Sequence, residues 1–337
     1  MTAASLARAL PSFEHHRRLV GLCSELCSTT YRIEIPNCVM KRTLVCIHVL
    51  PHELLMFERW MQDFRRSLPF LTPTDHLTLR PSLNLNPRLT DWSASPLPQE
   101  YFVAKFLGAI HGLHALHEIR SDDSLAGTSQ QKRECIALDY DQFIFADPDI
   151  AYPPYLIKGE LDVASKLSGR FMIFPPVVRL WEPAWDHVVH PDFLSKPLGY
   201  YLTHSPDETR SQTPKEISAV PLGSPKFGTG WMNMYSKDLM RFIGIPASLG
   251  GYGAEDNFIG VSSEVACQNG FPVSAYLLRN VYISEDYVSR DTTLLDTLNF
   301  KDTREKQRLE AESQVAHELS AFAKRAMGKN ISFSFGD

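Results

Sequence analysis

Two aspartates, one residue apart, end the most strand-like apolar run of the chain. In the stretch FIFADPDI, residues 143–150, Asp147 and Asp149 follow the apolar segment and enclose Pro148. In open α/β sheets, ligands bind beyond the carboxyl ends of the strands, and hard divalent cations prefer carboxylate oxygens. The pair therefore predicts a site for Mg²⁺ or Mn²⁺, which could offset the charge of a diphosphate leaving group. The alternative is an ordinary Asp-Pro-Asp turn.

A second acidic pair lies in the glycine-rich stretch GGYGAEDNFIG, residues 250–260. Gly251 and Gly253 allow positive φ or a close approach of the backbone to a ligand, and Glu255 and Asp256 open a predicted helix. A carboxylate near a helix N-terminus can act as a general base toward a hydroxyl group, and we expect this role for Asp256. An N-cap with an acidic first turn is the alternative. Neither alternative accounts well for both acidic pairs in one chain.

Other polar and aromatic residues could contact a substrate. Asn84 and Asn86 follow a predicted strand and could line a nucleotide pocket, or could form a turn. Lys132 and Arg133 precede the strand that carries the two aspartates, and could meet phosphates or belong to a solvated helix face. Trp231 could stack on a base. The candidate substrate-binding residues are Asn84, Asn86, Lys132, Arg133, Trp231, Gly251 and Gly253.

These residues can form one site only if a sheet brings the ends of its strands together, and the hydrophobic pattern predicts such a sheet. The pattern is typical of an α/β fold with a central, mostly parallel sheet flanked by helices. The expected strands cover 42–51, 75–87, 143–150, 170–176 and 271–284, and the expected helices cover 52–68, 127–140, 154–169 and 309–328. Thr128 or Ser129 should cap the helix over 127–140, and Gly169 should end the next helix. The stretch 199–225 predicts a mobile loop or an insertion at the edge of the sheet.

Size and composition limit the class of protein. The chain has 337 residues and a net charge of -5 at pH 7, which gives no overall electrostatic case for nucleic acid, although a basic groove can lie within an acidic total. We expect a catalytic domain over 42–290, an N-terminal extension over 1–41 and a C-terminal helical extension over 291–337. Scattered cysteines are typical of a reduced interior. No apolar run is long enough for a membrane span, and the N-terminus lacks the apolar region of a secretory signal, so we expect no membrane partner.

The combination of DPD at a strand end with GTGWMNMYS and YGAEDNFI further along the chain resembles the GT-A class of nucleotide-sugar glycosyltransferases. In that class an Asp-x-Asp element holds a divalent metal on the diphosphate of the sugar nucleotide. Inverting, galactosyltransferase-like members have a later Glu-Asp pair whose second acid is the base. The resemblance implies that Asp147 and Asp149 are the metal element, that Glu255 contacts the acceptor and that Asp256 is the base. It also implies a divalent cofactor, Mn²⁺ or Mg²⁺.

The chain departs from that class at three points. Tyr252 stands where the class often has tryptophan, and Asn257 stands where it often has a further acid. The third metal ligand, frequently a late histidine, has only Glu285 and Asp286 as stand-ins. The resemblance therefore leaves the third ligand open.

Four stretches, LNLNP, GTSQQKRE, FADPDI and LWEPAWD, are similar to a group of phage and protist glycosyltransferases that includes the kinetoplastid base J glucosyltransferases, which act on hydroxymethyluracil in DNA. This similarity implies UDP-glucose as donor, DNA as acceptor and a nuclear location, with the cytoplasm as the other location. A DNA acceptor would require basic residues near the acceptor mouth. The candidates are Arg65, Arg66, Lys132, Arg133, Arg210 and Lys215. The alternatives are a protein or glycan acceptor, and a sugar-nucleotide binding module without turnover.

Overall fold

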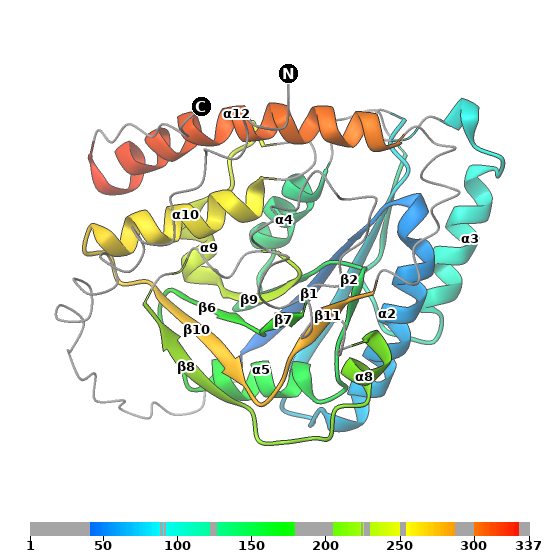
Figure 1. Cartoon of the computed structure of the whole chain (residues 1–337), viewed down its shortest axis with the longest axis horizontal. Helices are drawn as coiled ribbons and strands as arrows, with labels where there is room; N and C mark the ends of the chain where they lie inside the picture. Colours follow the sequence, from blue (N-terminus) through cyan, green and yellow to red (C-terminus); the bar gives the residue numbers. More distant parts are fainter. Residues whose placement is uncertain are drawn as a thin grey trace.

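An eight-stranded sheet forms the centre of the computed structural model, which describes residues 41–87, 90, 92–121, 127–178, 205–223, 225, 230–249, 254–286 and 300–329 (Figure 1). Its strands are β1 (Arg42–Val49), β2 (His76–Asn84), β3 (Glu118–Arg120), β4 (Gln142–Ala146), β6 (Phe171–Phe174), β8 (Ser218–Leu222), β9 (Met232–Ser236) and β10 (Ser274–Arg279). Their order across the sheet is β3-β2-β1-β4-β9-β6-β10-β8. Strands that are far apart in the sequence, such as β4 and β9, therefore lie side by side.

Most strands of this sheet run in one direction. The pairs β3–β2, β2–β1 and β1–β4 are parallel, and so is the pair β6–β10. Strand β9 is antiparallel to both of its neighbours, β4 and β6, and β8 is antiparallel to β10. All strands except β9 and β8 thus end at the same edge. The predicted α/β fold with a central, mostly parallel sheet is confirmed.

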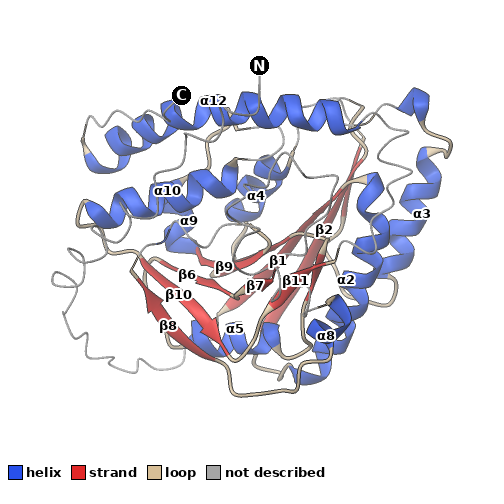
Figure 2. Cartoon of the chain, in the orientation of Figure 1, coloured by secondary structure: helices blue, strands red, loops and turns tan. Residues whose placement is uncertain are grey.

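Helices cover both faces of the sheet (Figure 1, Figure 2). One face carries α2 (Leu54–Ser67), α3 (Gln99–Ile110) and α5 (Leu156–Ser165), and the other carries α4 (Thr128–Ala137), α9 (Lys237–Ile243), α10 (Glu255–Gln268) and α12 (Phe300–Met327). Short 3-10 helices are η2 (Pro51–Glu53), η3 (Leu68–Phe70) and η4 (Trp92–Ala94). Over the described ranges, no helix has a stretch long and apolar enough to cross a bilayer.

The two faces have separate apolar cores because side chains alternate along each strand. On β1, Val45 and Ile47 pack in the cluster that contains side chains of α2, α3 and α5. Their neighbours Leu44 and Cys46 pack in the cluster with side chains of α4, α9, α10 and α12. A strand that is buried on both sides has no polar face, which explains the continuous apolar run over residues 44–47 of β1.

A second, smaller sheet lies beside the first. Its strands are β5 (Ile150–Ala151), β11 (Ile283–Glu285) and β7 (Val177–Val178), in the order β5-β11-β7. The short helix α8 (Pro206–Arg210) contacts β5 and β11. The DPD stretch is the turn between β4 and β5, so it links the two sheets.

Two details of the helices differ from the sequence predictions. Gly127 is the N-cap of α4, and no side chain caps this helix. The prediction of a Thr128 or Ser129 cap is wrong, because the Ser129 hydroxyl instead donates to Glu255 Oε2 at 3.4 Å. Helix α5 ends at Ser165 with Lys166 as C-cap. Gly169 has a φ of +72° and lies in the turn that leads to β6.

The stretch expected to be a mobile loop or an edge insertion contains regular structure within 205–223. Ser205 and Glu208 form a capping box at the start of α8, and β8 is the last strand of the large sheet. The edge position therefore agrees with the second of the two expectations.

Candidate active site

The DPD turn is fixed by backbone hydrogen bonds to two other segments. The Asp147 N–H donates to the Trp231 carbonyl at 2.6 Å, and the Trp231 N–H donates to Asp147 Oδ2 at 3.1 Å. On the other side of the turn, the Asp286 N–H donates to the Asp149 carbonyl at 2.5 Å. Both aspartate side chains are half-buried. The residues just before β9 and just after β11 thus hold the backbone of the two aspartates at the carboxyl end of β4.

The turn before β9 joins this pair to the second acidic pair. Trp231 has a φ of 63°, in the left-handed region that non-glycine residues rarely adopt, and its Nε1 donates to Glu285 Oε1 at 3.2 Å. Gly230 has a φ of +85°, and a Cβ at this position would lie 3.8 Å from Asp256 Oδ2. Because Asp147 bonds the backbone of this turn and Asp256 lies against it, the structure brings both acidic pairs into one site.

Lys132 neutralises part of this site. Its Nζ lies 2.8 Å from Glu255 Oε1 and 2.6 Å from Asp256 Oδ1, and 5.5 Å from the centroid of the Phe145 ring. Burial alone would lower the pKa of the Lys132 ammonium, but Asp256, Glu255 and Asp147 together raise that pKa well above its ordinary value. Lys132 is therefore a charged, buried counterion and does not belong to a solvated helix face.

The two acids of the second pair differ in what they can reach. Helix α10 begins at Glu255, so both carboxylates lie in its first turn, as predicted. The Glu255 side chain is 4% exposed and that of Asp256 is 27% exposed. Burial favours a raised pKa for Glu255, but its ion pair with Lys132 outweighs burial and lowers that pKa. Glu255 is thus an ionised, enclosed partner of Lys132 and has little surface for an acceptor.

Asp256 has the properties of a proton acceptor. Its pKa is raised by burial and by the nearby Glu255 carboxylate, and the ammonium of Lys132 offsets this only in part. A carboxylate with a raised pKa is a better general base near neutral pH than an ordinary one. Asp256 is also the more exposed member of its pair, so a hydroxyl group could approach it.

The site as a whole carries excess negative charge. We call Asp147, Asp149, Glu255, Asp256 and Lys132 the acid centre. When these groups are ionised, four carboxylates and one ammonium give a net charge of -3. His48, which is buried on β1, adds no positive charge at neutral pH, because burial lowers its pKa to about 4 even though Glu255 opposes that shift.

A divalent cation fits this charge distribution. Burial, followed by Asp149 and Asp256, raises the pKa of Asp147 well above its ordinary value, so a bound cation would relieve repulsion between carboxylates. Within the described ranges, no group of three or more His, Cys, Asp or Glu side chains could hold a metal ion. Asp147 and Asp149 are therefore the candidate protein ligands. Substrate phosphates and water would complete the coordination shell of the cation, as is usual for Mg²⁺.

The two stand-ins for a third ligand have other contacts. The Asp286 side chain is 2% exposed, with Oδ2 3.2 Å from Arg59 Nε, and it also pairs with Arg210. Glu285 accepts the hydrogen bond of the Trp231 indole. Asp286 is thus a structural counterion, and only Glu285 faces the same turn as Asp147.

The remaining candidate residues lie in different places. Asn84 and Asn86 are buried at the carboxyl end of β2, where Asn84 Oδ1 accepts the Asn86 N–H at 3.0 Å and stabilises the turn. Since β1 separates β2 from β4, this turn is two strands away from the DPD turn. Arg133 Nη1 donates to the Pro246 carbonyl at 2.7 Å, so its guanidinium does not join the acid centre. Gly251 and Gly253 lie outside the described residues.

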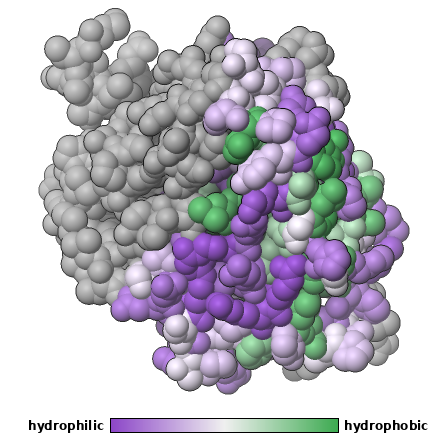
Figure 3. Space-filling view, turned by 90° about the vertical axis from the view of Figure 1, so that its right-hand side faces the viewer, coloured by the Kyte–Doolittle hydropathy of each residue, from purple (hydrophilic) through white to green (hydrophobic). Residues whose placement is uncertain are grey.

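Most basic residues named for a DNA acceptor are engaged within the protein. Arg65 donates to the carbonyls of Ala109 and His111 at 2.7 and 3.0 Å, and Arg210 Nε lies 2.8 Å from Asp63 Oδ2. Figure 3 views the side of the molecule where α2 and α8 lie, and hydrophilic residues gather over part of this face. Among the described basic candidates, Lys215 is exposed and has no hydrogen bond or ion pair.

Sequence reasoning missed the ion pair of Lys132 and the neutral His48. The signal for His48 was available, because it is the one residue with a basic side chain inside the largely apolar stretch 43–49. The partners of Lys132 lie more than 120 positions away, since Glu255 is 123 residues further along the chain, and no local pattern reports such a pairing.

Comparisons with known proteins add weak structural similarities. No protein-family model matches the chain, and no curated protein matches it. The crystal structure of S. aureus TarS 1–349 aligns with a TM-score of 0.44 at 10% identity, over 85% of this chain and 72% of that chain. The mannosyltransferase PcManGT from Pyrobaculum calidifontis, in complex with GDP-Man and Mn²⁺, aligns with a TM-score of 0.45 at 12% identity, over 94% and 84% of the two chains.

A third similar structure is glucosyl-3-phosphoglycerate synthase from Mycobacterium tuberculosis, in complex with Mn²⁺, UDP-glucose and phosphoglyceric acid. It aligns with a TM-score of 0.43 at 12% identity, over 87% of this chain and 86% of that chain. TM-scores and identities this low assign no activity to the chain. The functional conclusion therefore depends on the geometry of the acid centre.

Proposed function

We propose that the chain is a metal-dependent glycosyltransferase that moves a hexosyl group, with inversion, from a nucleoside diphosphate sugar to a hydroxyl acceptor. The observation that carries this proposal is the meeting of Asp147 and Asp256 at the Gly230–Trp231 turn. One acidic pair is suited to a cation, and the other offers a partly exposed carboxylate with a raised pKa. The proposed donor is UDP-glucose, and residues 42–290 form the proposed catalytic region.

Asp147 and Asp149 would hold the divalent cation, Mn²⁺ or Mg²⁺. Such a cation supplies charge neutralisation for the diphosphate that leaves. The chain contributes by fixing the backbone of both aspartates through hydrogen bonds with Trp231 and Asp286, and preorganised groups need little rearrangement when the substrate binds. The Asn84 turn lies on the same edge of the sheet, and we assign the nucleotide to that side.

Asp256 is the proposed general base. It accepts the proton of the acceptor hydroxyl while the hydroxyl oxygen forms a bond to the anomeric carbon of the donor. The bond from that carbon to the diphosphate oxygen breaks, and its electron pair leaves with the diphosphate. A single displacement of this kind inverts the anomeric carbon. Lys132 positions Asp256, because its ammonium also pairs with the enclosed Glu255 and so holds both carboxylates.

DNA containing hydroxymethyluracil stays a prediction as the acceptor. No observation on the described residues favours it over a glycan or a protein, because Arg65, Lys132 and Arg210 are used in internal contacts. A binding module without turnover would retain the metal pair, but it has no need for a partly exposed Asp256 with a raised pKa. The choice between an enzyme and a module is therefore a matter of measured turnover.

The test is release of the nucleoside diphosphate from UDP-, GDP- and ADP-sugars, with and without Mn²⁺, by the full chain and two variants. We expect release from at least one donor to require Mn²⁺ and to be lost in Asp147→Asn. Asp162→Asn, an exposed aspartate on α5, is the matched control and should behave like the wild type. Release that needs no metal, or that survives Asp147→Asn, would contradict the proposal. Metal-dependent binding without release would identify a binding module.

A further inference from the structure

A cavity of about 340 Å³ lies at the same edge of the sheet as the acid centre but has different walls. Pro176 follows β6, Tyr282 lies between β10 and β11, and Lys215 precedes β8. Strands β6 and β10 run in the same direction as β4, and the antiparallel β8 begins at the edge where they end. The cavity is large enough for a small ligand, and ligands of open α/β sheets bind at this edge.

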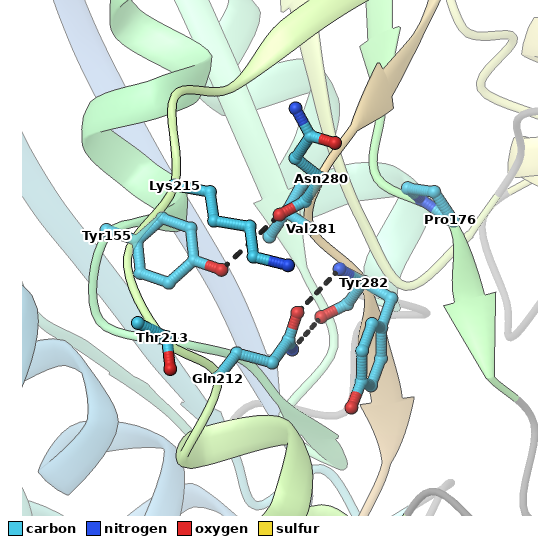
Figure 4. Close-up of a pocket in the computed structure, with 8 residues that line it drawn as sticks. All are labelled: Tyr155, Pro176, Gln212, Thr213, Lys215, Asn280, Val281 and Tyr282. Carbon is cyan, nitrogen blue, oxygen red and sulfur yellow. Dashed lines mark hydrogen bonds between the residues drawn. The ribbon is translucent and has the colours of Figure 1, made fainter.

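Hydrogen bonds join the segments that form the cavity walls (Figure 4). The Gln212 side-chain amide makes two hydrogen bonds with the backbone of Tyr282. Its Nε2 donates to the Tyr282 carbonyl at 2.7 Å, and its Oε1 accepts the Tyr282 N–H at 3.2 Å. The Tyr155 hydroxyl donates to the Asn280 carbonyl at 3.5 Å. The Gln212 bonds join the α8–β8 loop to the β10–β11 connection, and the Tyr155 bond joins the start of α5 to the same connection, so the cavity is preformed.

Lys215 is the one lysine or arginine among the residues that line the cavity. Figure 4 shows its ammonium pointing into the cavity, between Tyr155 and Tyr282. Within the described part of the chain it makes no hydrogen bond and no ion pair. Lys132, by comparison, is fully engaged with Glu255 and Asp256. A cation that faces a preformed cavity calls for an anionic ligand.

The aromatic lining indicates which kind of anion fits. Tyr155 and Tyr282 both line the cavity, and aromatic rings of this kind pack against the apolar faces of a sugar. A bare inorganic anion would leave this surface and most of the volume unused. The combination of Lys215 with two tyrosines therefore fits a sugar ring with an acidic group better than it fits a free ion.

The position of the cavity fits the acceptor and not the donor nucleotide. Across the sheet, β2 with Asn84 lies on one side of β4, and β10 lies on the other side, beyond β9 and β6. Three inter-strand steps separate β4 from β10, a distance of about 14 Å. The acid centre thus lies between the proposed nucleotide side and the cavity. A molecule that reaches from Asp256 to Lys215 would be longer than one sugar.

We propose that this cavity is an acceptor subsite for an anionic sugar unit, that is, a hexose that carries a phosphate or a carboxylate. The word acceptor rests on the proposed glycosyltransferase function, whereas the binding of an anionic hexose does not. Lys215 pairs with the acidic group and the tyrosine rings pack against the sugar. The hydroxyl that receives the new sugar lies on a more distant unit of the same molecule, next to Asp256.

Binding measurements test the subsite without requiring turnover. Calorimetric titrations of the full chain would use glucose 6-phosphate, glucuronate, neutral glucose and inorganic phosphate as probes. We expect at least one anionic hexose to bind about ten- to a hundredfold more tightly than glucose and than phosphate, as a charge-assisted bond predicts. If glucose 6-phosphate binds more tightly than glucuronate, the acidic group is a phosphate, and if glucuronate binds more tightly, it is a carboxylate. Lys215→Met should abolish the preference, and Lys166→Met, at another exposed lysine, should retain it.

Any of three results would contradict the proposed subsite. Glucose and the anionic hexoses could bind equally tightly, Lys215→Met could bind the anionic hexoses as tightly as the wild type, or phosphate could bind as tightly as glucose 6-phosphate. Cleavage of UDP-glucose with Mn²⁺ in the absence of acceptor reports on the acid centre separately. If the wild type cleaves no nucleotide sugar while Lys215 still governs hexose binding, the proposed function fails and the sugar site remains. If cleavage occurs and the preference is absent, only the subsite fails.

Discussion

Two clusters of charged side chains in this protein have opposite charge balances. The acid centre contains four carboxylates and one ammonium, that of Lys132, which pairs with Glu255 and Asp256. In a second cluster, which we call the arginine network, Asp63, Asp207 and Asp286 face Arg59, Arg66 and Arg210. The network balances three negative groups with three positive ones, whereas the acid centre does not. A cluster whose positive and negative charges balance needs no further ion. A cluster with excess negative charge indicates a site for a cationic ligand.

The two clusters are joined by one backbone bond. Asp286 belongs to the arginine network through its carboxylate, and its N–H donates to the Asp149 carbonyl in the acid centre. The balanced cluster therefore holds the backbone of the unbalanced one in place. Fixing charged groups before the substrate arrives is an effective way to stabilise a charged transition state. Variants in each cluster should accordingly separate losses of activity from losses of stability.

The largest expected effect is on turnover, in the acid centre. Asp256→Asn removes the proposed base but keeps the size of the side chain, so turnover should fall about 10²- to 10⁴-fold while donor binding changes little. The measurement is the rate of transfer at saturating donor, together with the affinity for the donor. A collapse of donor affinity would instead assign Asp256 to the nucleotide site.

The next effect is on stability, in the arginine network. The Arg210 side chain is 8% exposed and pairs with Asp63 and Asp286, both 2% exposed. Arg210→Met leaves these two carboxylates buried without their main counterion, so the free energy of unfolding should fall by about 3–5 kcal/mol. Urea denaturation measures this change. Arg66→Met, at a side chain that is 56% exposed, is the control and should cost about 1 kcal/mol or less. Equal losses of unfolding free energy in Arg210→Met and Arg66→Met would show that burial of the arginine makes no difference.

The sequence predicted one cluster better than the other, for a physical reason. Asp147 and Asp149 follow an apolar strand, and Glu255 opens a helix, so a periodic pattern marks their place. The arginine network has no such marker, because polar residues on helices and loops look alike until the fold pairs them. Which groups meet depends on long-range contacts, such as the pairing of β4 with β9 that brings Trp231 to Asp147.

A third prediction concerns pH and the charge of the acid centre. The pKa of His48 is lowered from 6.5 to about 4, chiefly by burial. Because the folded-state pKa lies below the unfolded value, the neutral imidazole favours folding above pH 6.5, and this contribution is lost as the pH falls toward 4. Between pH 7 and pH 4 the loss should be about 3 kcal/mol.

Urea denaturation of the wild type and of His48→Gln at both pH values measures this loss. We expect the decrease in unfolding free energy to be smaller in His48→Gln by about that amount, because glutamine has no proton to bind. An identical decrease in both proteins would show that His48 is not the buried neutral group that leaves the acid centre at a net charge of -3.

The smallest expected effect separates exposed from buried pairs within the arginine network. Asp207 Oδ1 lies 3.4 Å from both Arg59 Nη2 and Arg210 Nη1, but the Asp207 side chain is 85% exposed. Water and salt screen such a pair, so Asp207→Ala should lower the free energy of unfolding by less than about 1 kcal/mol, and added salt should reduce even that. Asp63→Asn, at 2% exposure, should cost more and respond less to salt, because its arginine partners would lose a buried counterion. The comparison by urea denaturation at low and high salt tests whether charge balance or burial governs the network. If Asp207 and Asp63 contribute equally to the free energy of unfolding, the number of ion pairs matters and their burial does not. The contrast between the arginine network and the acid centre would then depend on net charge alone.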